Sequence, residues 1–261
     1  MSLQVPVSIN EYGFTKNSPV GVHTARTMML AELRLLLAAL DTSANLADYR
    51  LAIIEENVLH KKTAVTRQDS FLRLRTLYIL DNKILLFRAL RDLWDDDIQA
   101  QAQIALLCAI ARDSLIKSTA EMILAIPIGE TVTPTIIMEA VSASFPDYYN
   151  PTTLASIGRN IISSWQQAGL LSGKLHKVRV KSESRPASVA YALLLGYLSG
   201  ERGEALFHTL WCRLLDTPVH ILHAQAFSAS QRGWIEYRHT GEITDVSFRF
   251  LLRKYGKDDR P

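Results

Sequence analysis

Apolar residues recur at every third or fourth position along most of this chain, which is the spacing of one face of an α-helix. Two of the segments, 98–112 and 115–125, are apolar on nearly all sides, so we expect them to form the buried centre. We also expect a helix to begin at Asp81. The other predicted helices cover residues 24–40, 47–57, 66–80, 133–144, 151–168, 187–198, 203–215 and 218–232.

Two segments alternate apolar and polar positions instead, which is typical of strands. One is residues 170–180, around a Ser-Gly-Lys turn, and the other is residues 235–250, around His239-Thr240-Gly241-Glu242. Residues 1–22 read as an extended lead-in, and the tail 254–261 as a frayed end. The predicted fold is mainly α, a helical bundle with helix–turn–helix or winged-helix-like segments and two short β hairpins.

Pro127, Gly129 and Pro134 interrupt the helical pattern and mark the clearest internal boundary. We expect three regions. Residues 1–126 form an N-terminal helical region with a basic helix–turn–helix-like segment. Residues 127–185 form a winged-helix-like segment, and residues 186–261 form C-terminal helices and a hairpin.

Positive charge is concentrated in the stretch Leu59–Leu80. Thr66 is the expected N-cap of its helix, with Asp69 in a capping pattern. Arg67 falls on the apolar side and could reach outward only from the first turn, whereas Leu72 falls on the polar side. The alternative is an ordinary solvated basic helix. The candidate DNA contacts of this stretch are Lys61, Lys62, Arg67, Gln68, Arg73 and Arg75.

Residues 133–181 follow the order helix, turn, helix, Gly, hairpin, which is that of a winged helix–turn–helix. The second helix has an apolar inner stripe and an outer face with few Glu or Lys residues. Its polar groups suit base edges and phosphates, and the basic hairpin suits phosphates. The alternative is a structural helix with a basic hairpin. The candidate contacts here are Ser156, Arg159, Ser163, Lys174, Lys177, Arg179 and Lys181, with Asn160, Gln166 and Gln167 on the same outer face.

The C-terminal segment repeats this order, but its helix 218–232 has little positive charge, so DNA or protein contact both remain open there. His208, Cys212, His220 and His223 are possible zinc ligands, but their spacing matches no standard site and core packing is favoured. Cys108 lies in an apolar helix, where a thiol is inert. Nucleophile-elbow and phosphate-loop motifs are absent from the sequence. We therefore expect no enzymatic activity, no cofactor or metal, and no small-molecule substrate.

The whole chain of 261 residues has a net charge of only +3, so composition alone does not indicate a nucleic-acid partner. Two cysteines, both in apolar contexts, favour a reducing cytoplasm over a disulfide framework. The N-terminus lacks the pattern of a signal peptide, and no run of 18 apolar residues exists. We expect a cytoplasmic protein without a membrane partner.

The order of these segments resembles the BrxA family of bacteriophage exclusion (BREX) defence systems, over roughly residues 10–215. The most specific parts are Glu55-Glu56-Asn57-Val58-Leu59 with the basic stretch after it, and Ala168-Gly169-Leu170-Leu171. The resemblance implies a non-catalytic double-stranded DNA-binding accessory component that acts beside the system's methyltransferase and ATPase. A protein-interaction scaffold of the same complex and a transcription regulator are the alternatives.

Overall fold

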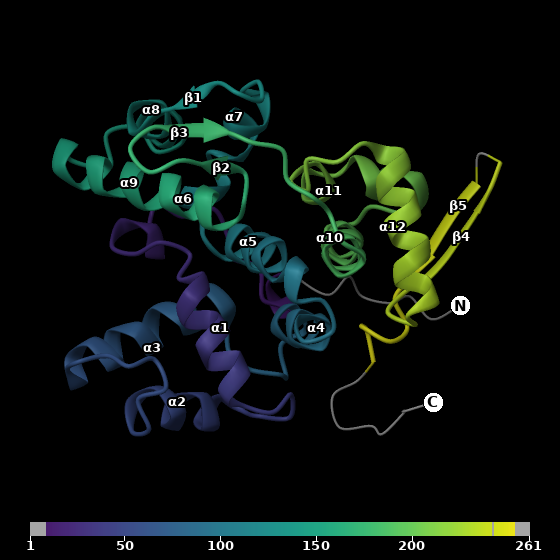
Figure 1. Ribbon diagram of the computed structural model, residues 1–261, viewed down its shortest axis with the longest axis horizontal. Coiled ribbons are helices and arrows are strands. Elements are labelled where there is room, and N and C mark those ends of the chain that lie inside the picture. The colour runs from purple at the N-terminus through teal and green to yellow at the C-terminus, as the bar shows by residue number, and fades with distance from the viewer. Residues whose placement is uncertain (1–8, 242, 254–261) are drawn as a thin grey trace.

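Helices make up most of the computed structural model, which describes residues 9–241 and 243–253 (Figure 1). The prediction of a mainly α fold with short hairpins is confirmed. The longer helices are α1 Leu30–Ala39, α2 Leu46–Ile54, α3 Ala64–Tyr78, α4 Leu85–Trp94, α5 Gln101–Arg112, α8 Pro134–Ser144, α9 Pro151–Gln167, α10 Pro186–Leu198 and α12 Val219–Gln231. The short ones are α6 Ser114–Lys117, α7 Ala120–Ala125, α11 Leu210–Arg213 and the 3-10 helices η1 Ile9–Tyr12, η2 Val22–Thr24, η3 Ile98–Ala100 and η4 Gly203–His208.

Helices α5 and α10 lie at the centre of the molecule, and α5 contacts α3, α4, α9 and α10 (Figure 1). The predicted burial of the segment 98–112 is correct for α5, which is apolar and buried on almost all sides. The buried cluster runs without interruption from Phe14 to Leu251, across both expected region boundaries. In the described ranges, no helix has both the length and the apolar character needed to cross a membrane.

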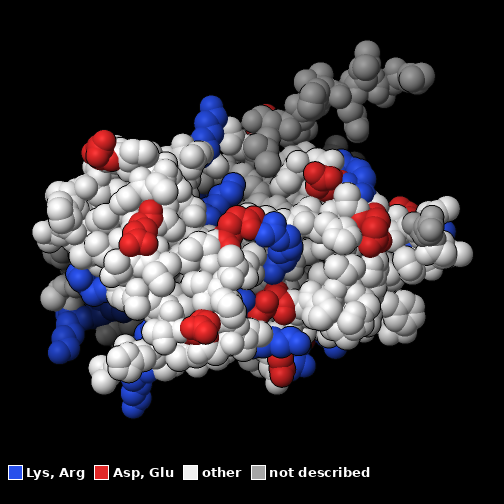
Figure 2. Space-filling model, turned by 90° about the horizontal axis from the view of Figure 1, so that it is seen from above, with Lys and Arg blue, Asp and Glu red and all other residues white. Residues whose placement is uncertain are grey.

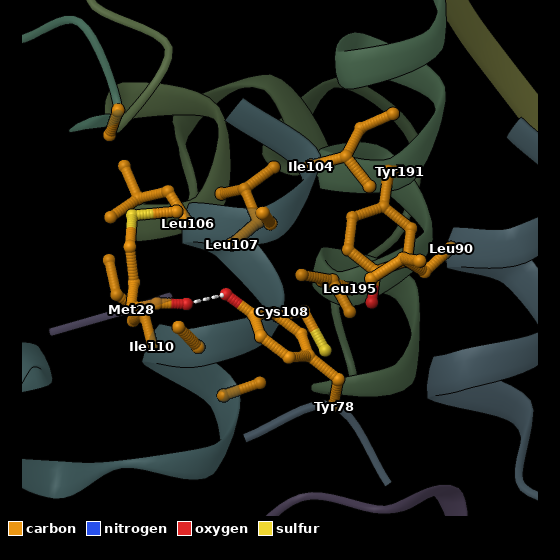
Figure 3. Close-up of a cluster of buried hydrophobic side chains, with 14 of the residues drawn as sticks. Met28, Tyr78, Leu90, Ile104, Leu106, Leu107, Cys108, Ile110, Tyr191 and Leu195 are labelled. Carbon is orange, nitrogen blue, oxygen red and sulfur yellow. Dashed lines mark hydrogen bonds between the residues drawn. The ribbon is translucent and has the colours of Figure 1, made fainter. Parts of the chain in front are cut away.

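Two tyrosines cross the core and satisfy their hydroxyl groups on backbone carbonyls (Figure 3). The hydroxyl of Tyr78 donates to the carbonyl of Met28, and that of Tyr191 donates to the carbonyl of Leu86 at 2.9 Å. Cys108 lies between these rings, where burial raises its pKa to about 12. The thiol is therefore protonated and inert, as its apolar helix predicts.

Helix α3 begins two residues earlier than expected, because Thr63 rather than Thr66 is the N-cap. The Thr63 hydroxyl accepts the backbone N–H of Thr66 at 3.2 Å. The helix also ends early, at Tyr78, because Ile79 and Leu80 have positive φ angles of 71° and 58°. Such angles cannot continue a right-handed helix.

Helix α1 begins at Leu30, whereas the sequence predicted a start at Thr24. This is the largest shift of a helix end from its prediction. Met29 has a φ of 54°, and the backbone N–H groups on either side of it donate to side chains of α9. The N–H of Met28 donates to the Ser164 hydroxyl at 2.8 Å, and that of Leu30 donates to the Gln167 side-chain oxygen at 3.1 Å. A tertiary contact thus replaces the first turns of the predicted helix.

Other predicted helices are interrupted or shortened, and the segment 47–57, for example, ends as a helix at Ile54. The segment 115–125 divides into α6 and α7, and the segment 203–215 divides into η4 and α11. The helix expected from Asp81 begins at Leu85. By contrast, α8 and α9 match their predictions closely, since Thr133 and Asn150 accept first-turn N–H groups and a proline follows each cap.

The first sheet has three strands where a two-stranded ribbon was expected. Strand β1 (Thr131–Val132) precedes α8 and pairs with β3 (Lys177–Arg179), which also pairs with β2 (Leu171–Ser172). The sheet order is β1-β3-β2, and all neighbours are antiparallel. The hairpin therefore does not stand alone but is fixed to the segment ahead of α8.

The second sheet is the expected C-terminal hairpin, β4 (Glu236–Thr240) and β5 (Ile243–Ser247), paired with Tyr237 opposite Val246. Its turn includes Gly241, with a φ of 59°. The strand ends at Ser247, so Phe248 and Phe250 lie beyond it, Phe250 in the turn that follows. The predicted frayed tail, 254–261, lies outside the described residues.

Candidate nucleic-acid interface

Helix α3 faces the core with Leu74, Leu77 and Tyr78, which are fully buried. Its opposite side carries Gln68 and Arg75, both exposed as the helical spacing predicts. Lys62 is exposed immediately ahead of the helix. Within the described ranges, neither Lys62 nor Arg75 forms an ion pair, so both charges are available to a partner.

Other cations of the basic stretch are partly neutralised by contacts within the chain. Lys61 Nζ lies 2.9 Å from a carboxylate oxygen of Glu32, and Arg73 Nε lies 3.1 Å from Asp69. Arg26 reaches the same Asp69 at 2.8 Å. Partial burial raises the pKa of Asp69, but hydrogen bonds from Arg26 and Arg73 outweigh burial and hold it below its ordinary value. Two guanidinium groups thus share one carboxylate, and Arg26 adds a cation that the sequence pattern did not reveal.

Arg67 and Leu72 lie as the helical projection predicts. Arg67 is half-buried, and its Nε atom is buried without a hydrogen-bond partner among the described residues. Leu72 is 55% exposed, so no described neighbour covers it. Val65 lies seven residues earlier on the same helix and is 76% exposed. The outer side of α3 is therefore both cationic and apolar.

Helix α9 presents a smaller free surface than the sequence predicts. Its apolar stripe, Ile157, Ile161 and Trp165, is fully buried. On the exposed side, Arg159 donates to the hydroxyl of Ser156 at 3.0 Å. Among the predicted contacts on α9, Ser156 and Ser163 are half-buried and Arg159 is exposed.

Part of the predicted outer face of α9 is covered by the N-terminal segment 22–30. Asn160 donates to the carbonyl of His23 at 3.0 Å, and Gln167 accepts from Leu30. The expectation that Asn160 and Gln167 face a partner is therefore wrong, because these amides hold a neighbouring segment of the same chain. A sequence pattern shows which side of a helix is polar, but not what covers that side.

The turn between β2 and β3 corresponds to the expected wing. Lys174 is exposed at this turn, together with Leu175, which is 93% exposed. Lys177 folds back, and its ammonium group donates to the carbonyls of Gly173 at 2.6 Å and Lys174 at 2.9 Å. Lys181 follows β3 and lines a hollow with Arg213 and Asp216. Lys174 is thus the exposed cation at the tip.

Arg179 is not on the surface, which corrects its assignment as a wing contact. Its side chain is 1% exposed and donates to the carbonyls of Ile123 and Leu170. It also pairs with Asp216 at 3.0 Å. The alternation of the strand turns this guanidinium inward, where it ties the sheet to α7 and to the turn before α12.

Gly173 allows the tight turn of the wing. Its φ is +104°, and a Cβ atom there would lie 2.0 Å from the carbonyl oxygen of His176. We expect Gly173→Ala to disorder the turn and to lower the free energy of unfolding by about 1–2 kcal/mol, since both strain and a clash result. Thermal denaturation measures this change. Gly129→Ala, at another positive φ but in open space, is the control and should cost less.

A buried network joins the segment 22–30 to α6 and α9. His23 Nδ1 lies 2.8 Å from Asp113, and His23 Nε2 lies 2.9 Å from the Ser164 hydroxyl. Aspartate, histidine and serine are linked by hydrogen bonds as in a catalytic triad, yet all three side chains are at most 1% exposed. No substrate can reach the serine, so the network is structural. Its members lie 90 and 141 positions apart, and sequence spacing gave no signal for it.

The segment 22–30 also brings the two candidate helices together. Its 3-10 helix η2 contacts both α9 and α3. Figure 1 shows α9 and α3 on the same side of the molecule, with the purple N-terminal segment between them. Seen from above, the surface carries cations interspersed with carboxylates rather than one continuous positive area (Figure 2). On that face, a partner would meet separate cations rather than a broad positive field.

No curated protein matches the chain. A protein-family model, that of BrxA, matches residues 22–125. The matched span begins at η2 and ends with α7, so it contains the basic helix α3, Asp113 and the sequence Glu55-Glu56-Asn57-Val58-Leu59. It is narrower than the expected 10–215, and Ala168-Gly169-Leu170-Leu171 lies outside it. The resemblance of this chain to the BrxA family is thereby confirmed over residues 22–125.

Proposed function

We propose that the chain is a non-catalytic, double-stranded DNA-binding accessory component of a BREX phage-defence system. The BrxA match supports the broader statement, a component of such a system. The observation that carries DNA binding is the placement of α3 and α9 on one side of the molecule, joined through η2. Both helices follow a shorter helix, as the second helix of a helix–turn–helix does.

The polar groups of this side divide into cations that suit phosphates and neutral groups that suit base edges. Lys62, Arg75, Arg159 and Lys174 are exposed, and none forms an ion pair with a described carboxylate, so they suit backbone phosphates. Gln68 can donate or accept at base edges, whereas the Ser156 hydroxyl already donates to the carbonyl of Thr152. The order α7, β1, α8, α9, β2, β3 with sheet order β1-β3-β2 supports a winged helix–turn–helix interpretation of residues 120–179.

Fluorescence anisotropy with a labelled 30-base-pair duplex tests the proposal. We expect binding that weakens by roughly tenfold to a hundredfold between 50 and 200 mM salt, because each phosphate contact releases counterions. About two to four phosphate contacts would give this loss of affinity. Two duplexes of unrelated sequence should bind alike; a strong preference for one would favour the transcription-regulator alternative. Absence of binding at 50 mM salt would refute DNA binding while leaving the family match intact.

A protein-interaction scaffold is the second candidate, and the exposed apolar groups of α3 favour it. Val65 and Leu72 lie two turns apart, and Leu51 on α2 is 49% exposed in the same helix pair. Exposed apolar groups on one pair of contacting helices suit a partner surface. The proposed partners are the system's methyltransferase and ATPase. Co-purification that survives nuclease treatment and is lost in Leu72→Gln would support the scaffold role.

A further inference from the structure

Three separate elements of the C-terminal region bring metal-binding side chains together. Glu204 lies on η4, His223 on α12 and His239 on β4. One nitrogen of each imidazole and one carboxylate oxygen lie within 4.8 Å of one another. His208, four residues after Glu204, places its Nε2 atom 3.7 Å from the same carboxylate. The positions are 16 to 35 residues apart in the chain, so local spacing did not reveal the cluster.

The contacts within the cluster centre on the Glu204 carboxylate. His223 Nε2 lies 3.1 Å from one of its oxygens, and the Thr244 hydroxyl donates to the other at 2.6 Å. The same Thr244 oxygen lies 2.8 Å from His239 Nδ1. Partial burial raises the pKa of Glu204, but hydrogen bonds from Thr244 and His223 outweigh burial and hold it below its ordinary value. The group is therefore a carboxylate, the form that binds a cation.

Groups outside the cluster orient the ligands, as they commonly do around protein metal ions. His223 Nδ1 lies 2.7 Å from the hydroxyl of Tyr237, which leaves Nε2 directed at the cluster. The His223 ring stacks on Phe207 with centroids 4.0 Å apart. Thr244, itself 8% exposed, fixes the carboxylate. One histidine and the carboxylate are thus held in place before any ion arrives.

We propose that Glu204, His223 and His239 form a binding site for one divalent transition-metal ion of the zinc type. Two imidazoles and a carboxylate are a common ligand set for Zn²⁺, and His208 is placed to supply a fourth ligand. Metal–ligand bonds of about 2.1 Å require ligand atoms roughly 3.4 Å apart, so the cluster must contract. His239 is exposed on the hairpin and can make this movement by side-chain rotation.

The bound ion would join η4, α12 and the β4–β5 hairpin, and would thereby stabilise the attachment of the hairpin to the helices. The other sequence candidates do not belong to the site. Cys212 is fully buried, and burial raises the pKa of its thiol to about 12, so it offers no thiolate. His220 is exposed on α12 and lines a separate hollow with Lys181. The site also lies outside the family match at 22–125.

The test is isothermal titration of ZnCl₂ into the untagged full-length chain after removal of metal with a chelator. We expect one saturable site, with the dissociation constant raised at least tenfold in His239→Ala and in Glu204→Gln. His220→Ala is the matched control, since it removes an exposed histidine from α12, the helix that carries His223. This variant should bind zinc as the unaltered chain does. Absence of saturable binding, or equal binding by His239→Ala, would overturn the proposal.

Thermal denaturation gives a second readout. Because an ion that binds only the folded state stabilises it, excess zinc should raise the melting temperature of the unaltered chain and of His220→Ala by several degrees. It should not raise that of His239→Ala, whose exposed side chain can be removed without disturbing the fold. An equal increase in all three proteins would indicate zinc binding elsewhere and would also overturn the proposal.

Discussion

Reversing two exposed charges on the basic stretch, Lys62→Glu with Arg75→Glu, is expected to weaken duplex binding by roughly fiftyfold or more near 0.1 M salt. Each lost phosphate contact should also lower the slope of log affinity against log salt by about 0.9, so the double variant should lose about 2. Both side chains are exposed and form no described ion pair, so the fold should be unaffected. Anisotropy over a salt series measures both quantities.

The matched control is Arg232→Glu with Arg238→Glu, which changes the net charge equally. Both residues are exposed in the C-terminal region, near the hairpin on the far side of the molecule from α3 (Figure 1). We expect less than a threefold loss of affinity for this control. Equal losses in the two double variants would mean that net charge, not the α3 surface, governs binding, and would contradict the proposed interface.

Removing the buried carboxylate in Asp113→Ala is expected to lower the free energy of unfolding by about 3–5 kcal/mol, the usual cost of leaving one buried partner unpaired. Asp113 accepts from the ring of His23 and from the backbone N–H groups of His23 and Leu115. All three would be left without this acceptor. The loss should loosen the segment 22–30 and, through Ser164, its contact with α9.

Urea denaturation measures the change, and Glu183→Ala serves as control. The Glu183 carboxylate is 86% exposed and lies 3.6 Å from Arg185, so its removal should cost less than about 1 kcal/mol. Hydrogen exchange would locate the effect of Asp113→Ala at residues 22–30 and α9. Similar costs for the two variants would show that the buried network adds little to stability.

The same carboxylate predicts an acid dependence with a definite sign. Burial raises the pKa of Asp113, but the nearby His23 ring and its hydrogen bonds prevail and hold the pKa below the ordinary 3.8. A lowered folded-state pKa means that the contribution to stability is complete above pH 3.8. It is lost as the pH falls from 3.8 through the folded-state value. Below that window, the unaltered chain and Asp113→Ala should differ least.

The sequence by itself determined most of the helices and the outward direction of their side chains. Caps such as Thr133 and Asn150, with the proline after each, are local signals, and a few neighbouring residues contain all that is needed to read them. The helical period likewise placed Arg75 outward and Leu72 among polar neighbours. These features depend on backbone geometry, which repeats within each element.

Only the tertiary structure decided which polar groups remain free. Arg179 belongs to the basic hairpin that the sequence predicts as a wing, yet its side chain is buried against Ile123 and Asp216, 56 and 37 residues away. Arg26 reaches Asp69 from 43 residues away, and Glu204 meets His223 and His239, through contacts that no spacing rule encodes. The period of a helix or strand determines the direction in which a side chain points. Whether that side chain is buried or paired depends on which other segment of the chain packs against it. Packing between distant segments therefore determines where a partner or an ion can bind.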